Sequence, residues 1–307
     1  MDYNILGKTG MNISRLGIGL AEIGIEGTTQ KNVTELLNTA IDLGINFFDT
    51  AACYNNSEDL VGNAINSRRD EFFLATKCGH PTNRINGTEW TKDIISKTID
   101  DSLKRLKTDY LDLIQLHSCE KEILEKGDVI TALTDAKKQG KTRFIGYSGD
   151  NDNAIWAVEH NTLFDTLQTS FNLVDQKARR TLFKQANQAG LGIIIKRPIA
   201  NGAWNKAKLN DPNSGPSTEY GREYFERAKI MVREGNFEKE SINPIKTSIS
   251  FTLSYKEINT AIIGTRNINH LKNNINMLNE GYKIDSNIKE KIEKQFDICN
   301  QNWEQLN

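Results

Sequence analysis

The stretch from residue 110 to residue 147 carries the repeating unit on which the fold prediction rests. It begins with YLDLIQL (residues 110–116), continues through an amphipathic segment that ends at Gly140, and closes with RFIGY (residues 143–147). Short apolar runs on either side of a helix-length segment are typical of parallel strands that are buried on both faces and joined by a crossover helix. The stretch therefore predicts one complete β/α unit and the strand of the next.

The same alternation extends in both directions along the chain. Apolar runs predict strands at residues 16–19, 45–48, 71–76, 110–116, 143–147, 166–169, 192–196 and 260–263. Amphipathic segments predict helices at residues 33–43, 57–68 and 90–106, before Gly140, and at 153–159, 176–189 and 268–278. Repeated strand–helix units of this number and length fit a closed (β/α)8 TIM barrel, which needs about 250 residues.

The residues outside this repeat predict three additions to a single domain that spans residues 1–307. Two short apolar segments around a Gly-Lys-Thr-Gly turn predict an N-terminal hairpin over residues 4–14. After the seventh strand, residues 200–240 predict a lid-like insertion, with a turn-rich loop and a polar helix at 222–234. Residues 288–304 predict a C-terminal helix that packs across the barrel.

A doubly wound sheet is the alternative fold for alternating strands and helices. Its dinucleotide site is usually marked by Gly-x-Gly-x-x-Gly after the first strand. The nearest match here, GIGLAE at residues 17–22, has Glu22 in place of the third glycine. The barrel is therefore favoured.

Composition argues against several classes of protein. The chain has 39 Lys and Arg against 40 Asp and Glu, a net charge of −1, so it offers no overall basic surface for nucleic acid. No run approaches the roughly 18 apolar residues of a membrane-spanning helix, and no signal peptide precedes the first strand.

The four cysteines form no Cys-x-x-Cys pair, which suits a reducing cytosol and predicts free thiols without a metal site. We expect a cytoplasmic protein with a small-molecule partner, and the sequence leaves the oligomeric state open.

Four titratable side chains are expected at one rim of this barrel. Asp49, Lys77 and His117 each stand at the end of a predicted strand, and Tyr54 follows in the loop after Asp49. Barrel enzymes carry their catalytic groups at the carboxyl ends of the strands. Each residue alone has a structural explanation, such as a helix cap or a solvated lysine, but independent structural causes would not gather all four at one rim.

The chemistry of these four groups points to proton delivery onto an oxygen. A Tyr hydroxyl has a pKa of about 10, and a neighbouring Lys ammonium held by a carboxylate lowers it. A neutral His can donate a hydrogen bond to a carbonyl oxygen and orient it. No side chain supplies hydride, so reduction of a carbonyl by this site implies a nicotinamide cofactor.

Three motifs resemble those of the aldo-keto reductases. They are GINFFDTAACYNNSE at residues 44–58, FLATK at residues 73–77, and DSLKRL followed by YLDLIQLH within residues 101–117. The resemblance covers residues 6–274 and implies the same barrel fold. It also implies that Asp49, Tyr54, Lys77 and His117 form a catalytic tetrad, with Tyr54 as the proton donor in NAD(P)H-dependent carbonyl reduction.

The resemblance further implies a set of cofactor-binding residues. Two positions depart from the family pattern: Gly149 stands where an Asn follows Ser148, and Lys196 stands where many members stack a Tyr on the nicotinamide. NADP(H) is the preferred cofactor because Arg266 offers a charge-assisted bond to a 2′-phosphate, with NAD(H) as the alternative. The implied residues are Gly19, Asp49, Ser148, Gln168, Lys196, Arg197, Pro198, Ile199, Ala200, Gly264, Thr265, Arg266, His270, Asn273 and Asn274.

Substrate contacts are expected from the loops above the rim. The candidates are Ala21, Glu22, Asn55, His80, Trp90, Ser118, Cys119 and Trp204. They do not identify the carbonyl compound. Two other functions remain open: a sugar or polyol dehydrogenase that works in the oxidative direction, and a cofactor-binding regulatory subunit without significant turnover.

Overall fold

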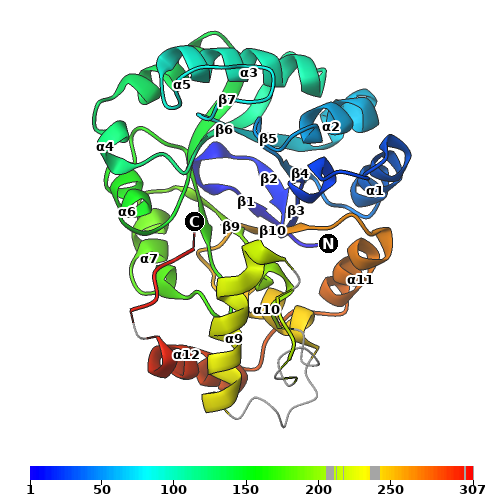
Figure 1. Cartoon of the computed structure of the whole chain (residues 1–307), viewed down its shortest axis with the longest axis vertical. Helices are drawn as coiled ribbons and strands as arrows, with labels where there is room; N and C mark the ends of the chain where they lie inside the picture. Colours follow the sequence, from blue (N-terminus) through cyan, green and yellow to red (C-terminus); the bar gives the residue numbers. More distant parts are fainter. Residues whose placement is uncertain (205–210, 212, 217, 236–242, 301, 307) are drawn as a thin grey trace.

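A closed barrel of eight parallel strands forms the centre of the molecule, so the predicted fold class is confirmed (Figure 1). The computed structural model describes the whole chain except residues 205–210, 212, 217, 236–242, 301 and 307. The barrel strands follow one another in chain order from β3 to β10. They are β3 Leu16–Gly19, β4 Phe47–Asp49, β5 Phe73–Cys78, β6 Leu111–His117, β7 Thr142–Ser148, β8 Thr166–Ser170, β9 Gly192–Lys196 and β10 Thr260–Gly264.

The last strand closes the ring by pairing with the first. Ala261 of β10 lies opposite Leu16 of β3, and on its other side β10 pairs with β9. Because all the strands are parallel, their carboxyl ends meet at one rim, which is where such barrels hold their functional groups.

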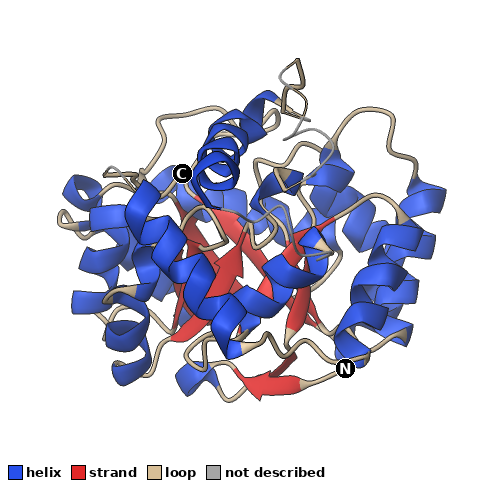
Figure 2. Cartoon of the chain, turned by 90° about the horizontal axis from the view of Figure 1, so that it is seen from below, coloured by secondary structure: helices blue, strands red, loops and turns tan. Residues whose placement is uncertain are grey.

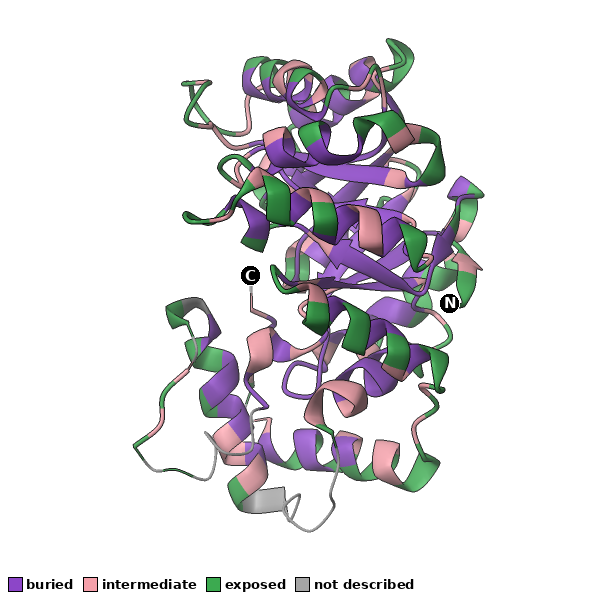
Figure 3. Ribbon diagram, turned by 90° about the vertical axis from the view of Figure 1, so that its right-hand side faces the viewer, coloured by how far each residue is buried: buried purple, intermediate pink, exposed green. Residues whose placement is uncertain are grey.

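Helices surround the barrel and bury one face against it. Figure 3 shows this pattern, with buried and exposed residues alternating along each helix. Side-chain caps set several helix starts; Thr29 accepts from the Asn32 N–H, and Thr91 accepts from the Ile94 N–H. The described helices are α1 Gln30–Asp42, α2 Ser57–Ile65, α3 Lys92–Leu106, α4 Lys121–Leu124, α5 Asp128–Lys138, α6 Asn151–Glu159, α7 Leu182–Gln188, α9 Arg222–Gly235, α10 Pro244–Leu253, α11 Ile268–Asn279 and α12 Ser286–Cys299. No helix among the described residues has both the length and the apolar character needed to cross a membrane.

The predicted N-terminal hairpin closes the amino end of the barrel. Its strands, β1 Tyr3–Ile5 and β2 Asn12–Ser14, lie beneath the barrel strands in Figure 2. Leu6, Met11 and Ile13 are buried in one cluster with inward-facing side chains of the barrel. Gly7 has φ +48°, and a Cβ there would lie 2.3 Å from the Gly192 nitrogen, so the turn requires glycine. The hairpin thus leaves the opposite, carboxyl end for function.

The bounds of several predicted helices were wrong. The helix expected at 57–68 ends at Ile65, and the one expected at 176–189 is limited to Leu182–Gln188. The helix expected at 288–304 covers Ser286–Cys299, because the residues after it leave the helix and bond to the barrel instead. Helix α10 was not predicted, since Thr and Ser interrupt its apolar pattern.

The expected insertion at residues 200–240 lies partly outside the described residues. Within it, the polar helix predicted at 222–234 is confirmed as α9. Two single 3₁₀ turns, Ala200–Gly202 and Glu219–Gly221, precede α9.

Candidate active site

Asp49 and Lys77 form a buried ion pair at the carboxyl end of the barrel. Asp49 ends β4 and Lys77 lies in β5, the neighbouring strand, and each side chain is 2% exposed. Lys77 Nζ donates to Asp49 Oδ1 and, at 2.8 Å, to the main-chain oxygen of Thr50. Burial lowers the pKa of Lys77, but Asp49 and then Tyr54 outweigh burial and raise this pKa above its ordinary value. The ammonium is therefore charged at pH 7.

The second oxygen of the Asp49 carboxylate is held by two amides. Gln115 Nε2 donates to Asp49 Oδ2 at 3.1 Å, and Gln168 Nε2 donates to the same oxygen at 2.9 Å. Ser148 Oγ in turn donates to Gln168 Oε1 at 3.1 Å. Gln115 was not among the predicted site residues. A polar residue inside the apolar run of β6, two positions before His117, is the signal that could have identified it.

The loop that carries Tyr54 is fastened by Arg105 of α3. The Arg105 guanidinium donates to the main-chain oxygen of Ala52 at 3.0 Å and to that of Asn55, on either side of Tyr54. It also forms a buried ion pair with Glu58, at 3.2 Å. Since both carbonyls accept from one rigid, planar group, this contact fixes the direction in which the loop presents Tyr54. Arg105 was predicted only as part of the motif at residues 101–106, without a role of its own.

Tyr54 lies between the ammonium and the imidazole. Lys77 Nζ is 5.1 Å from the centroid of the Tyr54 ring. The Tyr54 and His117 rings meet edge to face, with centroids 5.6 Å apart. The structure thus brings together all four residues that were predicted to lie at one rim of the barrel.

His117 has an environment that keeps its ring neutral. Burial, followed by the positive charges of Lys77 and Lys196, holds the pKa of His117 well below its ordinary value. Its Nδ1 lies 3.3 Å from the sulfur of Cys53, the residue before Tyr54. A neutral imidazole carries one N–H and one acceptor nitrogen, so it can donate a single ring hydrogen bond to a substrate.

A second imidazole, His80, supports His117 from the β5–α3 loop. His80 Nε2 donates to the main-chain oxygen of His117 at 3.0 Å, while His80 Nδ1 lies 2.6 Å from Glu89. The ring packs on Trp90, with centroids 4.6 Å apart, and a Cβ on Gly79 would overlap the Trp90 side chain.

The residues implied for the nicotinamide end of a cofactor lie around β7, β8 and β9. Ser148 and Gln168 are joined to Asp49 as described, and Gln168 keeps one further N–H and one lone pair. Lys196 Nζ is 2.8 Å from Asp150, and burial lowers the pKa of this lysine. Pro198, Ile199 and Ala200 follow in the turn after β9.

The C-terminal segment reaches the same end of the barrel. Gln305 Nε2 donates to the main-chain oxygen of Ser170 at 2.8 Å and to Thr169 Oγ1 at 3.1 Å. Arg197 donates to the main-chain oxygen of Leu306, so its guanidinium points to this segment. Residues 302–304 were predicted as the end of the C-terminal helix, and the sequence pattern does not reveal these long-range contacts.

The residues implied for the adenosine end gather at β10 and the start of α11. Arg266 and His270 are exposed, and Arg266 Nη1 lies 3.5 Å from Thr28 Oγ1. Asn267 caps α11 by accepting from the Asn269 and His270 N–H groups. In this group Thr265 and Asn274 are buried, Asn273 is exposed, and Gly264 lies beside Gly19 in the β3–β10 pair.

The predicted substrate residues divide into two sets. Trp90 joins the site through His80, and Ser118 directly follows His117 with φ +63°. Asn55 is exposed in the Tyr54 loop, and Cys119 is fully buried. Ala21 and Glu22 are exposed near the end of β3, and Trp204 is 8% exposed.

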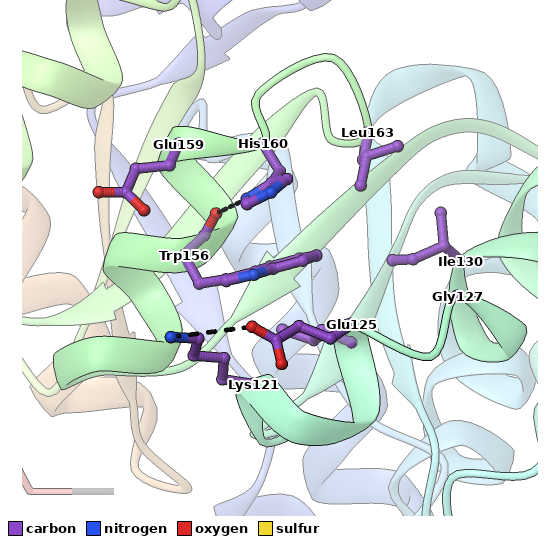
Figure 4. Close-up of a pocket in the computed structure, with 9 residues that line it drawn as sticks. Lys121, Glu125, Gly127, Ile130, Trp156, Glu159, His160 and Leu163 are labelled. Atoms are coloured by element: carbon purple, nitrogen blue, oxygen red, sulfur yellow. Dashed lines mark hydrogen bonds and ion pairs between the residues drawn. The ribbon is translucent and has the colours of Figure 1, made fainter.

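A separate cavity of about 560 Å³ lies outside the barrel, among α4, α5 and α6 (Figure 4). Trp156 and His160 stack in it, with ring centroids 3.9 Å apart. None of the predicted site residues lines this cavity.

Comparison with known proteins identifies the class to which this fold and this arrangement belong. The model of the aldo/keto reductase family matches residues 15–293. The chain is a member of the aldo-keto reductase family and hence a nicotinamide-dependent oxidoreductase.

Individual relatives agree with this assignment. An uncharacterized oxidoreductase of Bacillus subtilis, YqkF, is 29% identical, and the match covers 92% of this chain and 93% of the relative. The L-galactose dehydrogenase of Arabidopsis thaliana is 27% identical, over 91% and 89% of the two chains. Among solved structures, the holo form of an aldo-keto reductase from Bacillus halodurans has a TM-score of 0.80 and 25% identity, covering 96% of each chain.

Proposed function

We propose that this protein uses NADP(H) to reduce an aldehyde or ketone to the alcohol, with Tyr54 as the proton donor. The observation that carries the proposal is the buried, charged Lys77 beside the Tyr54 ring, held in place by Asp49. When bound, the nicotinamide supplies hydride to the carbonyl carbon. The side chains of this protein supply the proton and position the carbonyl oxygen.

Lys77 and Asp49 prepare Tyr54 to release its proton. A phenol with a pKa of about 10 is a poor acid at pH 7, and a neighbouring ammonium stabilises the phenolate that remains after proton transfer. Asp49 keeps the ammonium charged and oriented, and the two Gln amides keep Asp49 oriented. Positive charge is therefore in place before the carbonyl oxygen becomes negative, which is the most effective form of electrostatic stabilisation.

His117 is assigned the role of positioning the carbonyl oxygen. Its low pKa makes it a neutral donor at pH 7, so it orients the oxygen without competing with Tyr54 for the proton transfer. Arg105 contributes indirectly, because it fixes the loop from which Tyr54 approaches.

The backbone after β9 fits a negatively charged cofactor. Arg197, Ala200 and Asn201 have φ values of 59°, 48° and 53°. Turns of this kind can form concave anion sites, although the Ala200 N–H here already donates to the Arg197 main-chain oxygen at 2.9 Å. The buried Nδ2 of Asn201 has no hydrogen-bond partner among the described residues, which leaves a donor for a ligand.

We assign the adenosine end to Gly264, Thr265 and the first turn of α11. The dipole of α11 favours a phosphate at its amino end, where Asn267 already accepts from the Asn269 and His270 N–H groups. The exposed Arg266 supports a 2′-phosphate and hence NADP(H) over NAD(H).

Oxidation of a sugar or polyol is the second candidate, favoured by the similarity to L-galactose dehydrogenase. The same four residues would serve it, with Tyr54 accepting the proton. A regulatory subunit that binds cofactor without turnover is the third possibility, and the complete Asp-Tyr-Lys-His arrangement argues against it.

Fluorescence titration with NADPH and NADH, followed by a panel of aldehydes, ketones and polyols with each cofactor, tests the proposal. We expect tighter binding of NADPH, and turnover of at least one carbonyl compound. The Tyr54→Phe variant should bind cofactor with unchanged affinity and lose nearly all turnover. Normal turnover by this variant would rule out the mechanism, and binding without turnover across the panel would favour the regulatory subunit.

A further inference from the structure

The His117 ring is held by contacts on several sides, and one of them is specific to a ring nitrogen. His80 and Tyr54 pack against it edge to face, with centroids 5.4 Å and 5.6 Å away. His80 also donates to the main-chain oxygen of His117, which ties the imidazole pair to the strand end. Within this cage, Nδ1 lies 3.3 Å from Cys53 Sγ.

Three proton arrangements are compatible with this distance. The thiol can donate to an unprotonated Nδ1, Nδ1–H can donate to the sulfur, or the pair can be a thiolate and an imidazolium. They differ in what the other ring nitrogen, Nε2, presents: a donor in the first and third cases, and a lone pair in the second. A carbonyl oxygen accepts hydrogen bonds only, so the second arrangement would repel it.

The charges around the pair disfavour the ionic arrangement. Burial raises the pKa of the Cys53 thiol, against a smaller opposing influence of Lys77. Burial and Lys77 hold the pKa of His117 well below its ordinary value. Both shifts favour a neutral thiol beside a neutral imidazole. Of the two neutral arrangements, the one in which the thiol donates is favoured, because an imidazole nitrogen is a far better acceptor than a thiol sulfur.

We propose that the Cys53 thiol donates to His117 Nδ1 and thereby holds His117 in the tautomer that carries its proton on Nε2. Cys53 is then a positioning residue, because it acts on substrate through His117. The proposal deepens the proposed function and rests on it for its catalytic meaning, but the tautomer itself is a property of the free protein. The hydrogen bond on one nitrogen of a histidine generally selects which nitrogen is protonated.

The tautomer is measured by ¹⁵N NMR of the full chain labelled in its histidines. The protein has four histidines, and the His117 signals are those absent from a His117→Gln spectrum. We expect wild-type His117 to be protonated on Nε2 at pH 7. Cys53→Ser keeps a donor and should keep this tautomer, whereas Cys53→Ala and the bulkier Cys53→Val should shift population to the Nδ1–H form.

The kinetic arm uses whichever carbonyl compound the panel identifies. Loss of one hydrogen bond predicts a decrease in kcat of about 3- to 10-fold for Cys53→Ala and Cys53→Val, with cofactor affinity unchanged. Cys53→Ser should lie within about 2-fold of wild type, because it retains the O–H donor. Cys299→Ala, which removes a buried thiol from α12, is the matched control and should leave kcat unchanged.

Two results would overturn the proposal: a wild-type His117 protonated on Nδ1, or a tautomer that is the same in Cys53→Ala and Cys53→Val as in wild type. Because NMR needs no substrate, these results are independent of turnover. A Cys53-dependent Nε2–H tautomer in a protein that reduces no carbonyl compound would refute the proposed function and leave this inference standing.

Discussion

The ion pair between Lys77 and Asp49 places two charges where water does not reach them. Removal of one partner from such a pair leaves an uncompensated buried charge, whereas an exposed pair contributes little. After Lys77→Met, the Asp49 carboxylate would retain only the Gln115 and Gln168 amides as described donors.

We expect Lys77→Met to lower the free energy of unfolding by about 3–5 kcal/mol, measured by urea denaturation at pH 7. The double variant Asp49→Asn/Lys77→Met should recover part of this loss. Lys137→Met breaks the more exposed pair with Asp165 and should cost no more than about 1 kcal/mol. Equal losses for the two single variants would contradict the argument.

The buried carboxyl group of Asp175 predicts that the stability of the protein depends on pH. It accepts from Tyr224 and from the Leu306 N–H, yet burial, followed by the Asp150 charge, raises the pKa of Asp175 to about 7. Between about pH 4 and pH 7 the folded protein retains a proton here that the unfolded chain releases, so this group lowers stability as the pH rises.

Asp175→Asn should therefore gain stability relative to wild type between pH 5 and pH 8, by about 2–3 kcal/mol. Urea denaturation of both proteins at the two pH values measures this difference. A difference that is constant with pH, or that falls as the pH rises, would show that the pKa of Asp175 is not raised in the folded protein.

At the residue scale, position at a strand end made Asp49, Lys77 and His117 predictable, because the barrel itself dictates where strand ends meet. Arg105 was not predictable as a site residue. Its role depends on α3 lying beneath the Tyr54 loop, a tertiary contact that leaves no periodic signal in the sequence.

Among the elements, α2 and α3 pack so closely that their backbones touch. A Cβ on Gly62 of α2 would lie 2.2 Å from the main-chain oxygen of Arg105. Gly→Ala in a helix usually stabilises by about 0.5–1 kcal/mol, but overpacking costs about 1–3 kcal/mol, so the clash dominates here. The same contact keeps Arg105 within reach of the Tyr54 loop.

Gly62→Ala should thus lower both stability and turnover, as thermal unfolding and the carbonyl assay can measure. Asn63→Ala, at the exposed neighbouring position, is the matched control and should stabilise the helix by a few tenths of a kcal/mol. Stabilisation by both substitutions would show that α2 can move away from α3.

The elements were predictable where one pattern dominated. The run at residues 192–196, with three consecutive isoleucines, was placed to the residue as β9. Helix α10 escaped prediction because its hydroxyl residues are buried too, so polarity no longer marks the outer face. The predicted end of α12 was wrong because the residues after this helix form hydrogen bonds with the barrel instead of another helical turn.

Considered as a whole, the molecule fastens its last residues to the functional rim. Gln305 bonds to β8 and to the Asp150 side chain, and its Oε1 accepts from the Asn151 N–H. Gln305→Ala should cost about 1–3 kcal/mol and increase hydrogen exchange of the Asn151 and Leu306 amides.

Glu304→Ala in the same segment breaks only a more exposed pair with Lys177 and should change stability by less than about 1 kcal/mol. Gln305→Glu should be worse than Gln305→Ala at pH 8, since it brings a carboxylate against Asp150. If Gln305→Ala and Glu304→Ala are indistinguishable, the segment does not depend on Gln305.

The pairing of β10 with β3 has a consequence for synthesis of the chain. Leu16 leaves the ribosome well before its partner Ala261, because the chain between them is synthesised first. Until then β3 and β9 are open sheet edges, which are the surfaces by which nascent chains associate wrongly. Ring closure is thus delayed until β10 has been synthesised, and we expect slower translation to lengthen this vulnerable interval.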